Sequence, residues 1–244
     1  MDLEGKVAVI TGGAVRVGRA LTLALAEAGC HVFIHYGRSA QPAQETAVSA
    51  AQFGVKTAVF SADLADPAAT QQIIPQAVAT FGQVDILINS AAIFPEEDSF
   101  YQTDPALWQH LFAINLQAPF LLSQAFVAQL PPDQSGKIIN INDARLNRPL
   151  PDHFVYRLTK GGLWQMTEML AHALAPRITV NAVALGAILP PPGADETYLQ
   201  QIADERIPLR RAGNTTLVAQ NVLHLLRQDF LTGVTIPLDG GEFL

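Results

Sequence analysis

The chain has 244 residues, of which 49% are hydrophobic and 15% charged, and its formal net charge is −7. This composition indicates a globular protein with a large core and excludes a disordered or fibrous chain, while the acidic balance argues against general affinity for nucleic acid or anionic lipid. A single cysteine, Cys30, fits a reducing compartment, and the N-terminus lacks the residue order of a secretory signal, so we expect a cytoplasmic protein.

Seven apolar runs of strand length alternate with helical segments along the chain. This alternation indicates parallel strands joined by crossover helices. We therefore predict an α/β fold: one doubly wound, Rossmann-type domain over residues 1–244, with a seven-stranded, mostly parallel sheet and helices on both faces. The expected strands are Lys6–Thr11, His31–Tyr36, Lys56–Ser61, Val84–Asn89, Lys137–Asn142, Ile178–Ala184 and Val234–Leu238. The expected helices include Arg19–Ala28, Pro42–Gln52, Leu107–Gln129, Phe154–Ala175 and Thr216–Gln228.

The first strand ends in the glycine-rich stretch 11–18, directly before a helix. Gly12 permits a tight turn, Gly18 allows close approach of the helix, and the N-terminus of that helix offers unpaired N–H groups to a pyrophosphate. The position between strand and helix predicts dinucleotide binding, with a purely structural turn as the alternative. Arg16 and Val17 belong to this turn, and Arg16 has the reach to contact both the pyrophosphate and a substrate ring.

The second strand runs into Tyr36-Gly37-Arg38-Ser39 without the acidic residue that would accept hydrogen bonds from the ribose of NAD. Arg38 can instead bind a 2′-phosphate, assisted by the Ser39 hydroxyl, so the pattern favours NADP(H). The alternative is that Arg38 is a solvated loop charge. Asp63 and Leu64, just past the third strand, are expected near the adenine.

Tyr156 and Lys160 stand one helical turn apart, so both side chains share one helix face. A neighbouring ammonium would lower the pKa of the phenol from its ordinary value near ~10 and make it a usable proton donor. This pair predicts reduction of a polarised double bond by hydride from a nicotinamide, with a proton from the tyrosine. Asn115 is a candidate to hold a water that links Lys160 to solvent, or otherwise a residue at a helix bend.

The segment after the sixth strand contains three consecutive prolines, which cannot continue a helix or donate to a central strand. We expect a loop over Gly186–Ala194, and we assign 186–204 as a substrate-loop region because binding crevices form beyond the carboxyl ends of strands. An ordinary surface loop is the alternative.

Taken together, the motifs resemble the short-chain dehydrogenase/reductase family over essentially the whole chain. The resemblance rests on the Thr-Gly turn, on Asn89-Ser90-Ala91-Ala92 after the fourth strand, and on Asn115, Tyr156 and Lys160. It implies that Asn89, Ala91, Gly186 and Ile188 also contact the cofactor, and that the chain forms a homo-oligomer, a tetramer or dimer, through its long helices. Ala92 stands where the family usually has glycine, and Leu185 stands where it usually has proline. These two departures affect the expected geometry of the loops and leave the resemblance to the family unchanged.

Three further residues are similar to the pteridine reductase branch of this family. Arg16 stands where most members carry glycine, Asp143 stands at the serine position, and Phe94 stands at the position of the aromatic residue that sandwiches a pterin against the nicotinamide. Gly37 departs from the branch, which has a larger residue there.

Asp143 separates two classes of substrate. An ionised carboxylate only accepts hydrogen bonds and repels charge developing on a ketone oxygen, whereas a ring with N–H and amino groups offers it donors. A carboxyl with a raised pKa could also help protonate a C=N nitrogen. The alternative is an aspartate that caps the loop after the fifth strand.

These residues predict an NADPH-dependent reductase of dihydropterins, with dihydrofolate as a further candidate substrate. The second hypothesis is a carbonyl reductase of the same family acting on a 3-oxoacyl or sugar ketone, and the third, of another class, is a non-catalytic NADPH sensor. The six histidines are scattered without metal-ligand spacing, so no metal is predicted. The apolar stretch Ala182–Leu189 is far shorter than the ~20 residues of a membrane helix, and no span is predicted.

Overall fold

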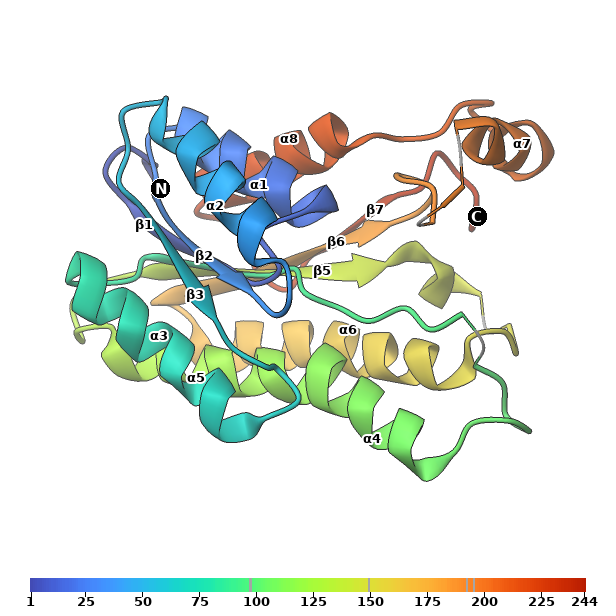
Figure 1. Ribbon diagram of the computed structural model, residues 1–244, viewed down its shortest axis with the longest axis horizontal. Helices are drawn as coiled ribbons and strands as arrows, with labels where there is room; N and C mark the ends of the chain where they lie inside the picture. Colours follow the sequence, from blue (N-terminus) through green and yellow to red (C-terminus); the bar gives the residue numbers. More distant parts are fainter. Residues whose placement is uncertain (97, 149, 192, 195) are drawn as a thin grey trace.

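The computed structural model contains one sheet of seven strands in the order β3-β2-β1-β4-β5-β6-β7, and all neighbouring strands run parallel (Figure 1). The strands are β1 (Val7–Ile10), β2 (His31–Tyr36), β3 (Thr57–Ser61), β4 (Ile86–Asn89), β5 (Gly136–Asp143), β6 (Ile178–Leu185) and β7 (Thr235–Leu238). The residues that the structure describes are 1–96, 98–148, 150–191, 193–194 and 196–244.

Helices cover both faces of the sheet, which makes three layers (Figure 1). On one face lie α1 (Arg16–Glu27), α2 (Ala40–Ala51) and α8 (Thr215–Arg227). On the other lie α3 (Pro67–Phe81), α4 (Pro105–Phe112), the π-helical turn η1 (Ala113–Gln117), α5 (Ala118–Gln129) and α6 (Phe154–Leu174). The short 3₁₀ helix η2 (Ala144–Asn147) follows β5, and α7 (Glu196–Arg206) lies beyond the carboxyl ends of β5 and β6.

The strand side chains alternate between two apolar clusters, one on each face of the sheet. In β1, Ala8 and Ile10 pack with α1 and α8, while Val7 and Val9 pack with α3 and α5. All four residues are buried, as expected for a parallel sheet with helices on both sides. The predicted fold class is therefore confirmed.

Two helices differ from the sequence expectation. α3 is not indicated by the sequence pattern, because Pro67 and Pro75 interrupt it, although Asp66 caps its first turn by accepting from the Ala68 N–H at 2.8 Å. α7 occupies most of the second half of the region 186–204, which is expected to be a loop. Within that region, residues 192 and 195 lie outside those that the structure describes.

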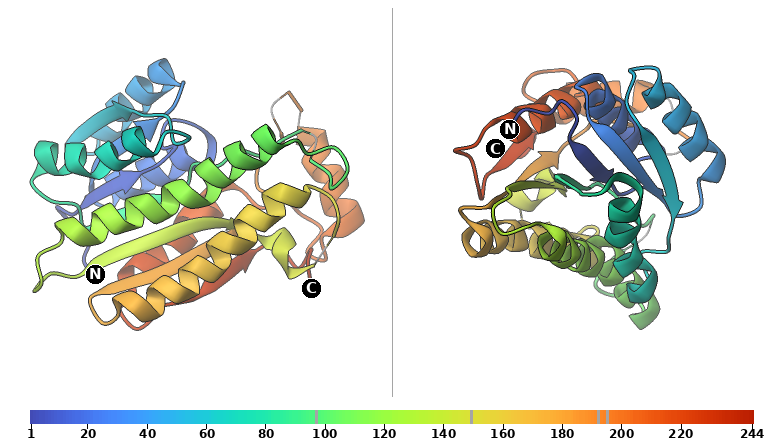
Figure 2. Two further views of the ribbon diagram at one scale, coloured as in Figure 1. Left: turned by 90° about the horizontal axis from the view of Figure 1, so that it is seen from below. Right: turned by 90° about the vertical axis from the view of Figure 1, so that its left-hand side faces the viewer.

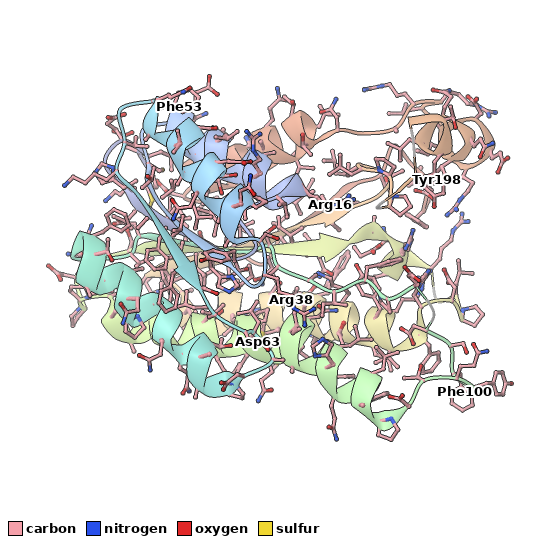
Figure 3. The ribbon with its side chains drawn as sticks, in the orientation of Figure 1. Arg16, Arg38, Phe53, Asp63, Phe100 and Tyr198 are labelled. Atoms are coloured by element: carbon pink, nitrogen blue, oxygen red, sulfur yellow. The ribbon has the colours of Figure 1, made fainter. Side chains whose placement is uncertain are left out.

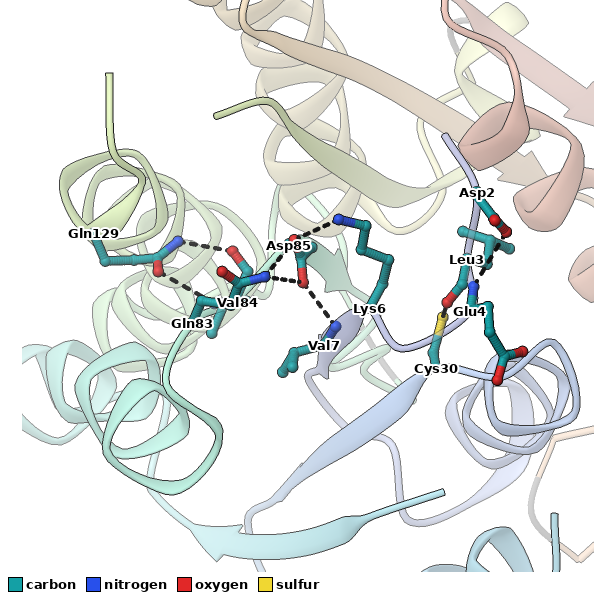
Figure 4. Close-up of polar contacts among 10 residues, drawn as sticks. All are labelled: Asp2, Leu3, Glu4, Lys6, Val7, Cys30, Gln83, Val84, Asp85 and Gln129. Atoms are coloured by element: carbon teal, nitrogen blue, oxygen red, sulfur yellow. Dashed lines mark hydrogen bonds and ion pairs between the residues drawn. The ribbon is translucent and has the colours of Figure 1, made fainter. Parts of the chain in front are cut away.

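The amino ends of the central strands are joined by a carboxylate (Figure 4). Asp85, at the start of β4, accepts hydrogen bonds from the Val7 N–H at 2.9 Å, Lys6 Nζ at 3.3 Å and Gln83 Nε2 at 3.0 Å. Because buried carboxylates need such partners, this network is a structural one that fixes β1 against β4. The opposite, carboxyl ends of the strands are left for binding.

One continuous helical run, Pro105–Gln129, has the length and hydropathy of a membrane-spanning helix among the residues described. In the fold it packs against α3 and α6 and supplies Leu111, Leu122 and Phe126 to the buried interior. This packing accounts for part of its apolar composition. Other apolar side chains of the run remain exposed.

Candidate active site

The predicted site residues gather at the carboxyl ends of the central strands. The sheet order reverses between β1 and β4, and this switch point is where open α/β sheets bind their ligands. Gly12 follows β1, Asn89 ends β4, Asp143 ends β5 and Gly186 follows β6. Residues far apart in the sequence thus lie at the same edge of the sheet, where open α/β sheets form a binding crevice.

The turn between β1 and α1 has the geometry of a phosphate cradle. Gly12 has φ +64°, and a Cβ on Gly18 would lie 2.0 Å from the Gly12 carbonyl oxygen, so only glycine fits there. Val15 at the start of α1 provides no side-chain cap, which leaves N–H groups of the first turn open to an anion. Val17 is partly buried behind the turn.

Two polar side chains brace this turn. Thr11 Oγ1 accepts from the Ser90 and Ala91 N–H groups at 3.0 and 3.1 Å, which ties the segment after β4 to the turn after β1. His35 accepts from the Gly12 N–H at 3.3 Å through Nδ1, and its Nε2 lies 3.0 Å from the Ala62 carbonyl oxygen. Burial lowers the pKa of His35, so the neutral ring suits both contacts. His35 is a residue whose supporting role the sequence pattern does not reveal.

The residues expected at the adenosine end follow the paired strands β2 and β3 (Figure 3). Tyr36 is half-buried, Arg38 is exposed, and Ser39 begins α2 without capping it. The Asp63 carboxylate accepts from the Ala65 N–H at 2.9 Å, and Leu64 is buried. Among the described residues, the side chains of Arg38 and Ser39 have no hydrogen-bond partner. Binding of a 2′-phosphate by them stays a prediction.

Arg16 joins the phosphate turn to the proline-rich segment. It has φ +52°, an uncommon value for a residue with a side chain, and its Nη2 donates to the Pro190 carbonyl oxygen at 2.8 Å (Figure 3). The contact brings residues 174 positions apart together above the crevice.

Tyr156 and Asp143 form a direct hydrogen bond. The Tyr156 hydroxyl donates to Asp143 Oδ2 at 2.9 Å, and both side chains are buried. Asp143 Oδ1 accepts from the Arg145 N–H at 2.8 Å and so caps η2. The loop cap, which was the alternative prediction for Asp143, is therefore present together with the contact to Tyr156, because each carboxylate oxygen has its own donor. Binding of a substrate ring by Asp143 stays a prediction.

The protonation of this pair differs from the sequence expectation. Burial, together with the negative charge of Asp143, raises the pKa of Tyr156 well above its ordinary value. Lys160 Nζ lies 6.0 Å from the Tyr156 ring centroid and donates to the Ile141 carbonyl oxygen at 2.9 Å. Burial lowers the pKa of Lys160 to about 8. The expectation that Lys160 lowers the pKa of Tyr156 is thus wrong for the cofactor-free protein, where the phenol faces a carboxylate.

Asn115 lies in the π-helical turn η1, where the helix departs from regular geometry. Its Oδ1 accepts from the Ile93 N–H at 2.8 Å, and its Nδ2 donates to the Ile93 carbonyl at 3.0 Å and to Thr159 Oγ1 at 3.2 Å. Asn115 therefore holds the segment after β4 against α6. A role in a water relay to Lys160 stays a prediction.

Phe94 presents an aromatic face beside Tyr156. Its ring centroid lies 4.8 Å from that of Tyr156 in an edge-to-face contact and 4.2 Å from that of His153, and 48% of the residue is exposed. His153 begins α6 with φ +47°, and its Nδ1 is buried without a hydrogen-bond partner among the described residues.

Asp98 is a buried residue that the sequence pattern does not indicate. Its carboxylate accepts from the N–H groups of Val155 at 3.0 Å and Tyr156 at 2.7 Å, which caps the first turn of α6. The contact spans 58 residues of sequence, so no local signal could have found it.

The remaining predicted residues line the back of the crevice. Asn89 Nδ2 donates to Asn140 Oδ1 at 2.8 Å, while Asn89 Oδ1 is buried without a partner in the described chain. A Cβ on Gly186 would lie 2.7 Å from Asp239 Cα, so glycine is required for the close approach. The Ile188 side chain packs in the core, so only its backbone is available to a ligand.

Comparisons with known proteins agree with this geometry. A family model described as enoyl-(acyl carrier protein) reductase matches residues 13–242. The chain is 32% identical to a 3-oxoacyl-[acyl-carrier-protein] reductase FabG from Staphylococcus epidermidis, over 98% of this chain and 99% of the relative.

Two solved structures are similar over almost their whole length. FolM alternative dihydrofolate reductase 1 from Brucella canis, complexed with NADP, is 34% identical with a TM-score of 0.94, covering 99% of this chain and 95% of that one. A mutant short-chain dehydrogenase/reductase from Serratia marcescens is 32% identical with a TM-score of 0.91, covering 100% of both chains.

The fold and the crevice thus define an oxidoreductase of the dinucleotide-binding, doubly wound class. Within that class, the chain belongs to the short-chain dehydrogenase/reductase family.

Proposed function

We propose that this protein is an NADPH-dependent reductase of dihydropterins, with dihydrofolate within its range. The observation that carries the proposal is the hydrogen bond of 2.9 Å between the Tyr156 hydroxyl and Asp143 Oδ2. The similarity to an alternative dihydrofolate reductase at 34% identity supports it.

The chemistry of the pair favours a nitrogen heterocycle over a ketone. A ketone oxygen gains negative charge during reduction, and a carboxylate hydrogen-bonded to the proton donor would repel that charge. A dihydropterin instead offers N–H and amino donors, which a carboxylate accepts. The exposed face of Phe94 beside Tyr156 suits stacking of such a flat ring.

The cradle after β1 would hold the pyrophosphate of NADPH, which supplies the hydride when bound. Gly12, Gly18 and the uncapped first turn of α1 fit the pyrophosphate. The buried Asn89 Oδ1 has no hydrogen-bond partner among the described residues, so it is available to a ligand. The NADP held by the similar dihydrofolate reductase agrees with this assignment.

Four residues of the chain would then have separate roles in the reduction. Tyr156 is a neutral phenol at neutral pH, as any tyrosine is near its ordinary pKa. Burial and the charge of Asp143 raise its pKa further, so it would hold the proton that the product nitrogen needs. Asp143 orients the phenol and is placed to receive donors from the ring. Lys160, with a pKa of about 8, is mostly cationic at neutral pH and would bind a ribose hydroxyl. Asn115 fixes the loop that carries Phe94.

Turnover of dihydrobiopterin, dihydromonapterin and dihydrofolate, followed by the loss of NADPH absorbance, tests the proposal. The Tyr156→Phe variant should lose about 10²- to 10⁴-fold in kcat and still bind NADPH, since only the positioned acid is removed. Asp143→Ser should lose pterin turnover and gain ketone turnover.

A carbonyl reductase is the second candidate, because the chain is also 32% identical to a 3-oxoacyl reductase. Good turnover of a β-keto thioester by the wild type, with none of any dihydropterin, would establish this candidate and refute the first.

Cofactor choice is tested at Arg38. Because a guanidinium binds a 2′-phosphate by charge-assisted hydrogen bonds, Arg38→Ala should weaken NADPH binding about 10- to 100-fold while NADH binding changes little. Arg211→Ala, another exposed arginine, serves as the control. If Arg38→Ala lost the same affinity for NADPH and NADH, Arg38 would not contact the 2′-phosphate.

We also propose that the molecule is a cytoplasmic homo-oligomer, a tetramer, assembled through its long helices. An apolar groove runs over α4, η1, α5 and α6, where the helices lie along one another (Figure 2). It is lined by Trp108, Phe112, Leu116, Phe120, Met166 and Met169. A second copy of this apolar face is the natural cover for such a surface.

The region 186–204 is proposed as the substrate lid. Arg16 already holds its Pro190 against the phosphate turn, and Arg206 at the end of α7 pairs with Glu242 near the C-terminus at 2.6 Å. The first contact ties Pro190 to the phosphate turn, and the second ties α7, which ends just past the region, to the C-terminal segment. Both contacts support the proposed lid.

A further inference from the structure

A cation lies at the edge of the crevice, next to the aromatic face of Phe94. The Arg145 guanidinium is 5.1 Å from the Phe94 ring centroid, and that ring is 4.8 Å from the Tyr156 ring. Arg145 is two residues beyond Asp143, on η2, and its charge acts on the pKa values of both Tyr156 and His153. The cation therefore lies beside the groups proposed to carry out the reduction.

The Arg145 guanidinium makes no hydrogen bond or ion pair with any residue that the structure describes. The neighbouring arginines differ: Arg157 bonds Asp152 Oδ1 at 2.7 Å, and Arg148 bonds the Leu244 carbonyl oxygen. The carboxylates near Arg145 are engaged, since Asp143 accepts from Tyr156 and Glu242 pairs with Arg206. Among the described residues the Arg145 side chain contacts the Phe94 ring and has no hydrogen-bond partner, so its N–H donors are open to a ligand.

The backbone of Arg145 is held from both sides. Its N–H donates to Asp143 Oδ1 at 2.8 Å, and its carbonyl oxygen accepts from Arg157 Nη1 at 2.6 Å. Arg157 is itself buried and paired with Asp152, so this anchor is rigid. A fixed backbone holds the base of the side chain beside Phe94, while its long stem can extend along the arm of a substrate, and such preorganisation lowers the entropic cost of binding.

We propose that Arg145 is a specificity-determining residue that binds a carboxylate on the side arm of the substrate. The proposal rests on the proposed reduction of dihydropterins at this site. A guanidinium matches a carboxylate by paired hydrogen bonds, and the aromatic face next to it suits a flat ring. The site therefore prefers a dihydropterin whose arm ends in a carboxylate, as in dihydrofolate, over one with a neutral hydroxylated arm.

The test is equilibrium binding by isothermal titration to the NADP⁺-loaded protein. The probes are folate, whose arm is anionic, and hydroxymethylpterin, whose arm is neutral. The variants are Arg145→Met, Arg145→Lys and the matched control Arg148→Met, a second exposed arginine three residues along the chain. Circular dichroism and the melting temperature check that each variant is folded.

The wild type should bind folate about 10- to 100-fold more tightly than hydroxymethylpterin, the range expected for hydrogen bonds to a charged group. Arg145→Met should abolish this preference, Arg145→Lys should restore part of it because the charge returns without the planar fork, and Arg148→Met should keep it. Higher salt should weaken the wild-type preference.

The outcomes separate this proposal from the proposed function. A wild type that reduces dihydrobiopterin but binds both probes alike, or an Arg145→Met variant that keeps the preference, overturns the role of Arg145 alone. A wild type that binds folate selectively through Arg145 but reduces no pterin refutes the function and leaves the carboxylate site. If the NADP⁺-loaded wild type does not bind folate at all, the proposed role of Arg145 is also overturned.

Discussion

At the scale of single residues, the Tyr156 to Asp143 hydrogen bond makes a prediction about titration. The negative charge of Asp143 is one cause of the raised pKa of Tyr156, because a phenolate beside a carboxylate is repelled. Asp143→Asn removes the charge and keeps an acceptor, so the pKa of Tyr156 should fall toward its ordinary value. Ultraviolet difference titration of the cofactor-free protein measures this, with Tyr156→Phe variants subtracted to isolate one tyrosine of four. An unchanged Tyr156 titration would show that burial alone sets its pKa.

Lys160 makes a second prediction, about the pH dependence of stability. Its pKa is about 8 in the folded protein and 10.5 in the unfolded chain. Between these values the unfolded state binds more protons, so the contribution of Lys160 to the free energy of unfolding rises with pH. The difference in unfolding free energy between wild type and Lys160→Met should therefore increase by about 1 kcal/mol per pH unit from pH ~8 to ~10. Urea unfolding measures it. Titration of Cys30, whose pKa burial raises to about 12, has the opposite effect but cancels in the difference. A flat difference would contradict the lowered pKa.

At the scale of elements, the start of α6 depends on Asp98. Asp98→Ala removes the acceptor of the Val155 and Tyr156 N–H groups and should lower stability by about 1 to 2 kcal/mol. Asp66→Ala, which uncaps α3 at the Ala68 N–H, is the matched control with a similar loss. Because Tyr156 lies in the turn that Asp98 caps, kcat should fall in Asp98→Ala while the KM for NADPH holds, and both should hold in Asp66→Ala. If the two folded variants had the same kcat, Asp98 would contribute to stability without positioning Tyr156.

Regular elements and local turns were the predictable part of this structure. Runs such as Val84–Asn89 are apolar throughout, and burial on both faces of a parallel sheet requires that pattern. The glycines at positions 12 and 18 follow from steric needs within one turn. The hydrogen bonds from the Tyr156 N–H to Asp98 and from the Gly12 N–H to His35 join distant segments, and no local pattern encodes them. The raised pKa of Tyr156 was missed because the ammonium is near in sequence while the carboxylate is nearer in space.

At the scale of the whole molecule, the two ends of the sheet serve different purposes. At the amino ends, Asp85 joins β1 to β4, and the buried Lys137 donates to Asp229 Oδ1 at 2.7 Å, which also pairs with the N-terminal ammonium (Figure 4 shows the Asp85 network). At the carboxyl ends, Asn89 Oδ1 and His153 Nδ1 are buried without a hydrogen-bond partner among the described residues, and the Arg145 guanidinium contacts the Phe94 ring. Thr179 Oγ1 and Thr235 Oγ1, toward the amino ends of β6 and β7, are also buried without a partner among the described residues. An unpaired polar group therefore supports a ligand site only together with the surrounding geometry.

The helical face opposite the sheet makes the last prediction, which concerns assembly. Phe120 is 43% exposed and Met169 is 63% exposed within the apolar groove. At its base Leu116 packs closely on Gly162, where a Cβ would lie 2.8 Å from Leu116 Cδ2. If a second copy covers this face, Phe120→Glu would bury a charge in the interface and should convert the oligomer to a monomer. Light scattering after size-exclusion chromatography measures the mass. Phe53→Glu is the control, because Phe53 is 47% exposed but lies at the end of α2, on the other side of the sheet (Figure 3). A monomeric wild type would show that no such interface forms. Loss of assembly in Phe53→Glu alone would place the interface on the other side of the sheet.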